Sequence, residues 1–283
     1  MDIQLLVVPY DSGNRGARMG AGPERLIEAG LERTLREGGH VVHTKLVEVS
    51  GDSWHAETQT SFELMRMLAR AVRAARESDR FPIVLAGNCN TAVGTLAGLG
   101  ADSTGVAWFD AHGDFNTPET TSSGFLDGTA LAIITGRCWT KLAATVPGFT
   151  PIADDRVCLI GTRDLDSLES ALLEESSVDV IEPKHLRSSL PRTLKSIRNH
   201  VENMYVHLDL DVLDSGVAPA NSYALAGGLT LEDLDHALAQ IAGEFRITGL
   251  TLSAYDPAVD TNGYAAQAAI RLVSTAARVA ERA

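Results

Sequence analysis

Two clusters of carboxylate residues, about a hundred positions apart, each follow directly on a short apolar run. The first cluster runs from Asp110 through His112 to Asp114, and the second is the Asp-Leu-Asp-Val-Leu-Asp stretch at 209–214. Residues at alternate positions near the end of a strand point to one face, so the acidic side chains of each cluster should converge. Carboxylates that close repel one another and stay ionised only where a positive group joins them. The spacing therefore favours a cation site over solvated acidic loops.

The make-up of the two clusters indicates which chemistry such a site could perform. Four carboxylates and one imidazole could hold two divalent cations about 3.5–4 Å apart, an arrangement that generates hydroxide from water. Oxygen-rich ligand sets suit Mn²⁺, so we expect two Mn²⁺ ions per chain, with other divalent metals as the alternative. The residues concerned are Asp110, His112, Asp114, Asp209 and Asp211.

Short β-rich runs alternate with helical stretches along the whole chain. This order predicts a mostly parallel sheet with helices on both faces, a three-layer α/β/α fold whose site lies beyond the carboxyl ends of the strands. Thr230 has acidic residues in the turn that follows it and is expected to cap a helix. A Gly-, Ser- and Thr-rich stretch at 116–128 is interpreted as an active-site loop. The expected strands lie at 5–8, 41–43, 83–85, 106–109, 157–160, 178–181, 205–208 and 247–252, and the expected helices at 23–37, 61–78, 90–98, 168–175, 191–203, 230–245 and 263–283.

Size and charge limit the classes of protein to which the chain can belong. It has 283 residues, a net charge of -13 and three cysteines without disulfide or zinc-finger spacing. The length fits one large domain, and the acidic balance argues against nucleic acid and anionic membranes as partners. The apolar start lacks a basic region, and no apolar run reaches the roughly 18 residues of a membrane span. We expect a cytoplasmic protein that acts on a small molecule.

The two acidic motifs resemble those of the arginase (ureohydrolase) family, as do the Gly-Gly-Leu-Thr stretch at 227–230 and the segment 160–166. The resemblance covers nearly the whole chain in order, which implies one catalytic domain over residues 1–283, a dimanganese centre and hydrolysis of guanidines. It assigns Asp110, Asp114 and Asp209 to one metal, and His112 and Asp211, together with the bridging Asp110 and Asp209, to the other. The last aspartate of the second cluster matches a family residue that is usually structural.

Three positions depart from the family pattern. Cys89 stands where the family motif Gly-Gly-Asp-His-Ser supplies a histidine ligand, and a thiolate is a competent ligand. The alternative is that Cys89 is a small buried residue and the ligand is missing. Asp127 stands where arginases have a proton-relaying histidine, and its role stays open between a catalytic or substrate contact and a bystander. Ala254 replaces a glutamate that pairs with the cationic guanidinium.

Positions that hold the amino-acid end of the substrate in arginases are kept. The resemblance assigns Asn116 and Ser123 to the α-carboxylate of the substrate and Asp166 to its α-amino group. Asn and Ser are also common in turns, so ordinary loop chemistry is the alternative for the first two. Phe125, where the family often has asparagine, weakens that assignment.

The altered guanidine end and the retained amino-acid end together predict the substrate. A site without the glutamate and the relay histidine suits a guanidine that is less basic and bulkier than that of arginine, and an Nω-hydroxyguanidine meets both conditions. The pattern most resembles the hydroxyarginine-hydrolysing members of the family that serve D-cycloserine biosynthesis. The expected reaction converts Nω-hydroxy-L-arginine to hydroxyurea and L-ornithine. The alternatives are an ordinary arginase or agmatinase, and a non-catalytic metal-binding protein.

Within the last expected helix, the helical stretch from Ala265 to Ala280 runs to within three residues of the end of the sequence. Family arginases often trimerise through an extended tail after this helix. We therefore expect a monomer, or a weak dimer at most, and the net charge of -13 also disfavours self-association.

Overall fold

The fold is built on one eight-stranded sheet with the order β4-β1-β5-β10-β9-β6-β7-β8. It is seen in a computed structural model that describes residues 1–49 and 56–282. Every neighbouring pair in the sheet is parallel, which confirms the predicted fold class. All eight predicted strands are present, and a short β2–β3 hairpin is added to them. The strands are β1 Asp2–Val8, β2 Tyr10–Asp11, β3 Asn14–Arg15, β4 Val41–Leu46, β5 Phe81–Ala86, β6 Thr104–Phe109, β7 Val157–Ile160, β8 Asp179–Ile181, β9 Asn203–Asp209 and β10 Arg246–Ser253.

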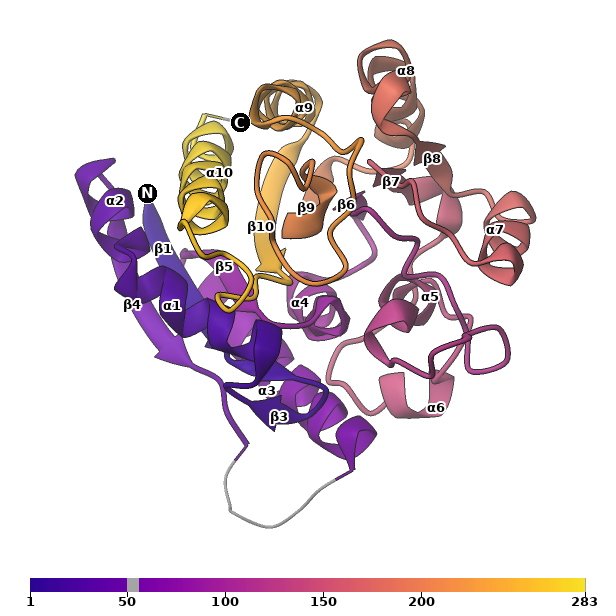
Figure 1. Cartoon of the computed structure of the whole chain (residues 1–283), viewed down its shortest axis with the longest axis horizontal. Helices are drawn as coiled ribbons and strands as arrows, with labels where there is room; N and C mark the ends of the chain where they lie inside the picture. Colours follow the sequence, from indigo (N-terminus) through magenta and orange to yellow (C-terminus); the bar gives the residue numbers. More distant parts are fainter. Residues whose placement is uncertain (50–55, 283) are drawn as a thin grey trace.

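Helices cover both faces of this sheet and give the three layers seen in Figure 1. The buried side chains of α1, α2, α8, α9 and α10 share one apolar cluster, and those of α3, α4 and α5 share the other. The α-helices are α1 Gly22–Glu28, α2 Leu31–Glu37, α3 Glu57–Glu77, α4 Ala92–Leu99, α5 Ala130–Ile134, α6 Thr140–Ala143, α7 Ser167–Glu174, α8 Leu186–Arg198, α9 Leu231–Glu244 and α10 Tyr264–Ala280. The 3₁₀ turns are η1 Arg18–Ala21, η2 Cys89–Thr91, η3 Asp127–Thr129, η4 Asp154–Arg156, η5 Pro183–His185 and η6 Leu210–Val212.

Four neighbouring strands at the centre of the sheet, β5, β10, β9 and β6, end at the same edge. Their interiors are buried on both sides, so hydrophobic residues there face both apolar clusters. The first acidic cluster follows β6 and the second begins at the last residue of β9, while Cys89 follows β5 within η2. Sheet order therefore brings together side chains that are more than a hundred residues apart in sequence.

Two helix predictions need correction. The expected helix 23–37 is divided into α1 and α2, because Gly30 has a φ of 105° and the helical path cannot continue through it. The expected helix 191–203 begins earlier, as α8 at Leu186, and ends at Arg198. Pro191 lies inside α8 rather than at its start, since Leu186, Leu190 and other apolar residues form a buried stripe that outweighs the lost N–H bond. Thr230 caps α9 as predicted, in a reciprocal capping box.

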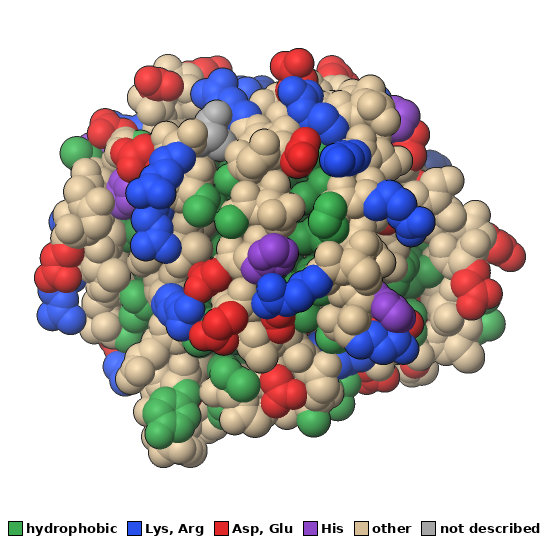
Figure 2. Space-filling model, turned by 90° about the horizontal axis from the view of Figure 1, so that it is seen from above, with side chains coloured by type: hydrophobic (Ala, Val, Ile, Leu, Met, Phe, Trp, Pro, Cys, Tyr) green, Lys and Arg blue, Asp and Glu red, His purple; other side chains and the backbone are tan. Residues whose placement is uncertain are grey.

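The two chain ends meet on the side of the molecule away from the acidic clusters. The amino group of Met1 forms an ion pair with Glu281 just beyond α10. Acidic and basic side chains are interspersed across the face shown in Figure 2. Within the described residues, no helix combines the length and the apolar character needed to cross a bilayer.

Gly87 links β5 to the turn that carries Cys89, and its packing generates a prediction. A Cβ atom at this position would lie 2.2 Å from the carbonyl oxygen of Tyr10 and 2.8 Å from the backbone of Gly20. We expect Gly87→Ala to displace the turn, lower the melting temperature and reduce metal retention. Gly243→Ala in α9 is the matched control, because its Cβ would meet nothing within 4 Å and alanine favours a helix. Thermal unfolding and metal analysis of both variants check this, and an unchanged Gly87→Ala protein would contradict it.

Candidate metal centre

The structure brings five of the six predicted ligands together in two groups at the carboxyl edge of the central strands, while Asp114 belongs to neither group. Potential ligand atoms of Cys89, Asp110 and Asp209 lie within 4.8 Å of one another, as do those of Asp110, His112 and Asp211. Asp110 belongs to both groups, as expected of a ligand that bridges two cations. The arrangement is that of two adjacent metal positions.

Backbone and indole N–H groups orient the acidic side chains. Asp110 Oδ1 accepts a hydrogen bond of 2.8 Å from the backbone N–H of His112, and its Oδ2 accepts one of 3.0 Å from the indole of Trp108. Asp209 Oδ1 accepts the backbone N–H of Asp211 at 2.8 Å. Each carboxylate therefore has one edge fixed by the protein while it faces its neighbours, which limits the entropy lost when a cation binds.

The electrostatics of these carboxylates indicate a missing positive charge. Burial raises the pKa of Asp110, and burial together with neighbouring carboxylates raises the pKa values of Asp114 and Asp209 well above the usual range. Oδ2 of Asp114 is buried without a hydrogen-bond partner among the described residues. An unsatisfied buried carboxylate oxygen beside two ligand groups fits a site built for divalent cations.

His112 responds to the same acidic surroundings. Burial alone would lower the pKa of its imidazole, but Asp110 and Asp211 overcome this and raise it to about 9. Its Nδ1 lies 3.3 Å from Asp110 Oδ1 and 3.5 Å from Asp211 Oδ2. A metal binds the neutral imidazole. Cation binding here would therefore displace the imidazole proton that the two carboxylates otherwise stabilise.

Cys89 lies at the centre of the first group and is almost fully buried. Its Sγ donates to Asp209 Oδ2 at 3.0 Å and lies 3.1 Å from the hydroxyl of Ser253. Burial, followed by the charges of Asp209 and Asp127, raises the pKa of this thiol well above its usual range. A cation at this position would reverse that effect, because a coordinated thiol is deprotonated.

A cavity of about 350 Å³ opens above the two groups. Asn116 and Asp166 lie on its wall, where the side-chain amide of Asn116 donates to Asp166 at 3.2 Å. Ser123 also lines the cavity, but its hydroxyl accepts the N–H of Phe125, and it is Ser122 that contacts Asp166, at 3.3 Å. The predicted substrate residues therefore share one wall, with Ser122 as a member that the sequence did not single out.

Asp127, the first residue of η3, also lines this cavity and is bonded to the turn that carries Cys89. One of its oxygens accepts the side-chain amide of Asn88 at 2.9 Å and the other accepts the backbone N–H of Asn90 at 2.8 Å. Burial raises its pKa to about 7 even though these hydrogen bonds act in the opposite direction. A carboxyl group that can hold or release a proton near neutrality thus lies on the wall of the cavity.

The loop beyond η6 is fixed by residues outside the two ligand groups. Asp214 accepts the backbone N–H groups of Gly216 at 2.8 Å and Gly228 at 3.2 Å, which is a structural role. The guanidinium of Arg163 donates to the backbone carbonyls of Asp211 at 2.9 Å and Leu213 at 3.1 Å. Together they hold the segment that carries Asp211 in place.

Sequence reasoning missed several polar residues at the site. Glu169 is buried and accepts the N–H of Phe115 at 2.8 Å, and Asn221 donates to Asp211 at 3.2 Å. His207 is fully buried, and burial lowers its pKa to about 3, so it is neutral. Both of its ring nitrogens have hydroxyl partners, Tyr205 at 3.1 Å and Ser253 at 3.2 Å. Its spacing of two positions before Asp209, on the same strand, was the one available signal.

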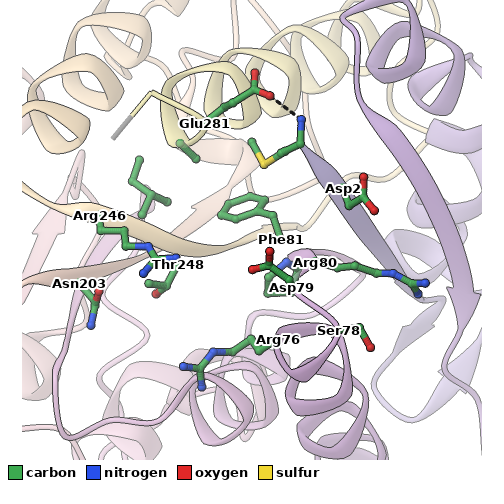
Figure 3. A pocket seen from close by; sticks show the side chains of 14 residues that line it. Asp2, Arg76, Ser78, Asp79, Arg80, Phe81, Asn203, Arg246, Thr248 and Glu281 are labelled. Atoms are coloured by element: carbon green, nitrogen blue, oxygen red, sulfur yellow. Dashed lines mark hydrogen bonds and ion pairs between the residues drawn. The ribbon is translucent and has the colours of Figure 1, made fainter.

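A larger cavity, of about 590 Å³, lies at the opposite edge, where β1, β5, β9 and β10 begin. Figure 3 shows that Arg76, Arg80 and Arg246 line it together with the carboxylates of Asp2, Asp79 and Glu281. The guanidinium groups donate and cannot coordinate a cation. Both ligand groups found among the described residues lie at the other edge, so the smaller cavity is the candidate active site.

Comparison with known proteins agrees with this geometry. The family model described as Arginase family matches residues 1–278. The chain belongs to the arginase family. An arginase of Bacillus caldovelox is 30% identical over 290 residues, covering 96% of this chain and 97% of the relative. An arginase of Brucella melitensis is 30% identical over 299 residues, covering 97% and 95%. The solved arginase structures from Bacillus caldovelox and Bacillus subtilis each superpose with a TM-score of 0.88 at 28% identity, covering 97% and 98% of both chains.

Membership makes the protein a metal-dependent hydrolase of the ureohydrolase type, which acts on a guanidino group. Members of the arginase family normally bind two divalent cations, typically Mn²⁺. The residues present fit such a pair, since they provide two ligand groups joined by Asp110 and an unsatisfied carboxylate oxygen on Asp114.

The thiol is the unusual member of this ligand set, and its substitution tests its role. We expect Cys89→Ser to lose bound metal or activity by roughly an order of magnitude or more, because an alcohol is a poor ligand beside a thiolate. Cys89→His should be tolerated, because imidazole is a competent ligand. Cys158→Ser is the control, a buried cysteine on the other face of the sheet. Metal content and rate that are unchanged in Cys89→Ser would show that Cys89 only fills space.

Proposed function

We propose that the protein hydrolyses Nω-hydroxy-L-arginine to hydroxyurea and L-ornithine, and that the hydroxyurea supplies D-cycloserine biosynthesis. The observation that carries this proposal is the wall of the cavity at Ala254. A methyl group lies there, at the position where the family pattern has a guanidinium-binding glutamate. Compared with the family pattern, the site therefore lacks one carboxylate and has more room beside the terminal nitrogens of the guanidine.

Loss of that carboxylate weighs against L-arginine as the preferred substrate. The guanidinium of arginine is always protonated, and a charge-assisted hydrogen bond to it is worth about 1.5–3 kcal/mol. A hydroxyguanidine is less basic because its oxygen withdraws electrons, so it needs this partner less. It is also longer by one hydroxyl group, for which alanine leaves more space than glutamate.

The chain supplies the remaining steps through its own side chains. A pair of divalent cations, when bound, supplies an activated water for attack on the guanidine carbon. Asn116, Asp166 and Ser122 form a polar wall that can hold the α-amino acid end of the substrate. Water adds to the carbon, the C–N bond to the side chain breaks, and the departing nitrogen takes a proton to become the amine of ornithine. Asp127, which lines the cavity, would deliver that proton.

Ordinary arginase activity is the second candidate, and the comparisons favour it. The relatives at 28–30% identity are named arginases, and each match covers 96% or more of this chain. Agmatine fits less well, because it lacks the carboxylate that the wall around Asn116 could hold. A purely metal-binding role is disfavoured by a ligand set that adjoins an open cavity.

Steady-state kinetics on the two amino acids separate these candidates. We expect kcat/KM for Nω-hydroxy-L-arginine to exceed that for L-arginine by at least about 10²-fold, or roughly 2.7 kcal/mol of transition-state stabilisation. Ala254→Glu should narrow the ratio by restoring the guanidinium partner. Ala258→Glu, at an exposed position in the turn nearby, is the matched control. A preference for arginine in the unmodified protein would establish ordinary arginase instead.

The role of Asp127 generates a separate prediction. We expect Asp127→Asn to keep the size of the side chain and one of its two accepted hydrogen bonds, but to lower kcat by about 10²-fold, since general acid–base help is typically worth 10²–10⁴-fold. KM should change little, because the amino-acid wall is intact. Asp102→Asn, in an exposed turn, is the control. A variant with normal kcat would show that Asp127 is a bystander.

A further inference from the structure

A second layer of side chains lies directly beneath the candidate ligands. Trp108, His207 and Thr251 are aligned across β6, β9 and β10 in the register of the sheet. Two residues further along, on the same face, come Asp110, Asp209 and Ser253, of which the last two are also in register. The lower row therefore supports the upper row strand by strand.

A continuous hydrogen-bond chain runs from this lower row to Cys89. The hydroxyl of Tyr205 lies 3.1 Å from Nδ1 of His207, and Nε2 of His207 lies 3.2 Å from the hydroxyl of Ser253. That hydroxyl is in turn 3.1 Å from Sγ of Cys89. At its far side, the hydroxyl of Tyr205 donates a 2.7 Å hydrogen bond to Thr251. All five side chains are buried, so the chain is shielded from water.

Trp108 joins this chain to the other ligand group. Its ring stacks on His207 with centroids 3.7 Å apart and planes at 14°. Its indole N–H donates at 3.0 Å to Asp110, the residue shared by both ligand groups. The stacked pair of Trp108 and His207 therefore contacts both ligand groups. Trp108 bonds directly to Asp110, and His207 reaches Cys89 through Ser253.

The hydrogen-bond chain from Tyr205 to Cys89 can adapt to a thiolate. Serine, tyrosine and neutral histidine each both donate and accept, so the direction of the hydrogen bonds can follow the charge on the sulfur. When the thiol loses its proton, Ser253 can turn its hydrogen toward Sγ, and Nε2–H of His207 can donate to Ser253. Tyr205 can then turn its hydrogen from Thr251 to Nδ1, while the hydroxyl of Thr251 donates to Tyr205. No group in the chain is left without a partner in that arrangement.

We propose that His207 is a positioning residue, which acts through Ser253 to orient Cys89 and to present a hydrogen-bond donor to its thiolate. This inference rests on the proposed role of Cys89 as a metal ligand. Groups that orient metal ligands in this way are typically worth 10–100-fold in metal affinity.

Cobalt substitution tests the proposal, because a thiolate bound to Co²⁺ gives a charge-transfer absorption that oxygen ligands do not. We expect the band in the unmodified protein and its loss in Cys89→Ser. Ser253→Ala should weaken or shift the band and raise the metal dissociation constant about 10–100-fold, measured by chelator competition.

Two histidine variants separate positioning from packing. His207→Asn can keep the bond to Tyr205 but falls short of Ser253, and it should behave like Ser253→Ala. His207→Gln places an amide near the former Nε2 and should restore the band and the affinity. Thr193→Val, a buried change in α8 on the other face of the sheet, is the control for general destabilisation. Thermal unfolding reports whether each variant folds. If the histidine variants do not fold, Ser253→Ala and Tyr205→Phe test the proposal in their place.

The outcomes distinguish the two claims. A band that disappears in Cys89→Ser but keeps its position and affinity in Ser253→Ala and His207→Asn would overturn the role of His207 and leave Cys89 as a ligand. A loaded protein with no thiolate band would overturn both claims.

Discussion

Repulsion among the carboxylates of Asp110, Asp114 and Asp209 is the interaction on which the rest of the site depends. Two unit charges 4 Å apart repel by about 4 kcal/mol even at an effective dielectric constant of about 20. The protein nevertheless buries all three, and burial pushes each pKa upward. Such a site is costly without cations and strongly favours them when they are present. The fold tolerates this cost because the rest of the sheet is apolar and closely packed.

The parallel sheet converts that constraint into a reaction site. Carboxyl ends of three central strands, β5, β6 and β9, bring the ligands together, and the loops that leave the carboxyl edge build the cavity above them. Beneath the ligands, the same strands carry the row of Trp108, His207 and Thr251. The site is therefore held from below by rigid strands and bounded from above by loops, which can vary with substrate while the metal positions stay fixed.

Much of this could be predicted from local sequence. Apolar runs that end in alternating carboxylates identify β6, β9 and the ligands that follow them, because strand geometry sends alternate side chains to one face. The position of Pro191 within α8 could not be predicted, since tertiary burial of the leucine stripe outweighed a local rule. The division at Gly30 also depends on a backbone angle that the sequence allows but does not require.

The supporting residues were harder to predict for a different reason. Ser253 meets His207 only because β10 and β9 are paired in one particular register, and Glu169 reaches Phe115 from a helix about fifty residues away. Neither residue belongs to an acidic motif, so no local pattern marks it. Long-range register is a property of the folded sheet, and it decides which buried polar side chains become part of a site.

The central claim is that these buried groups form a two-cation centre in which sulfur is one of the ligands. Anomalous diffraction from crystals grown with Mn²⁺, collected on either side of the manganese absorption edge, tests it directly. The account predicts two manganese peaks per chain, one contacting Asp110 and Cys89 Sγ and the other contacting Asp110, His112 and Asp211. A single peak, or two peaks with Cys89 turned away from both, would contradict it.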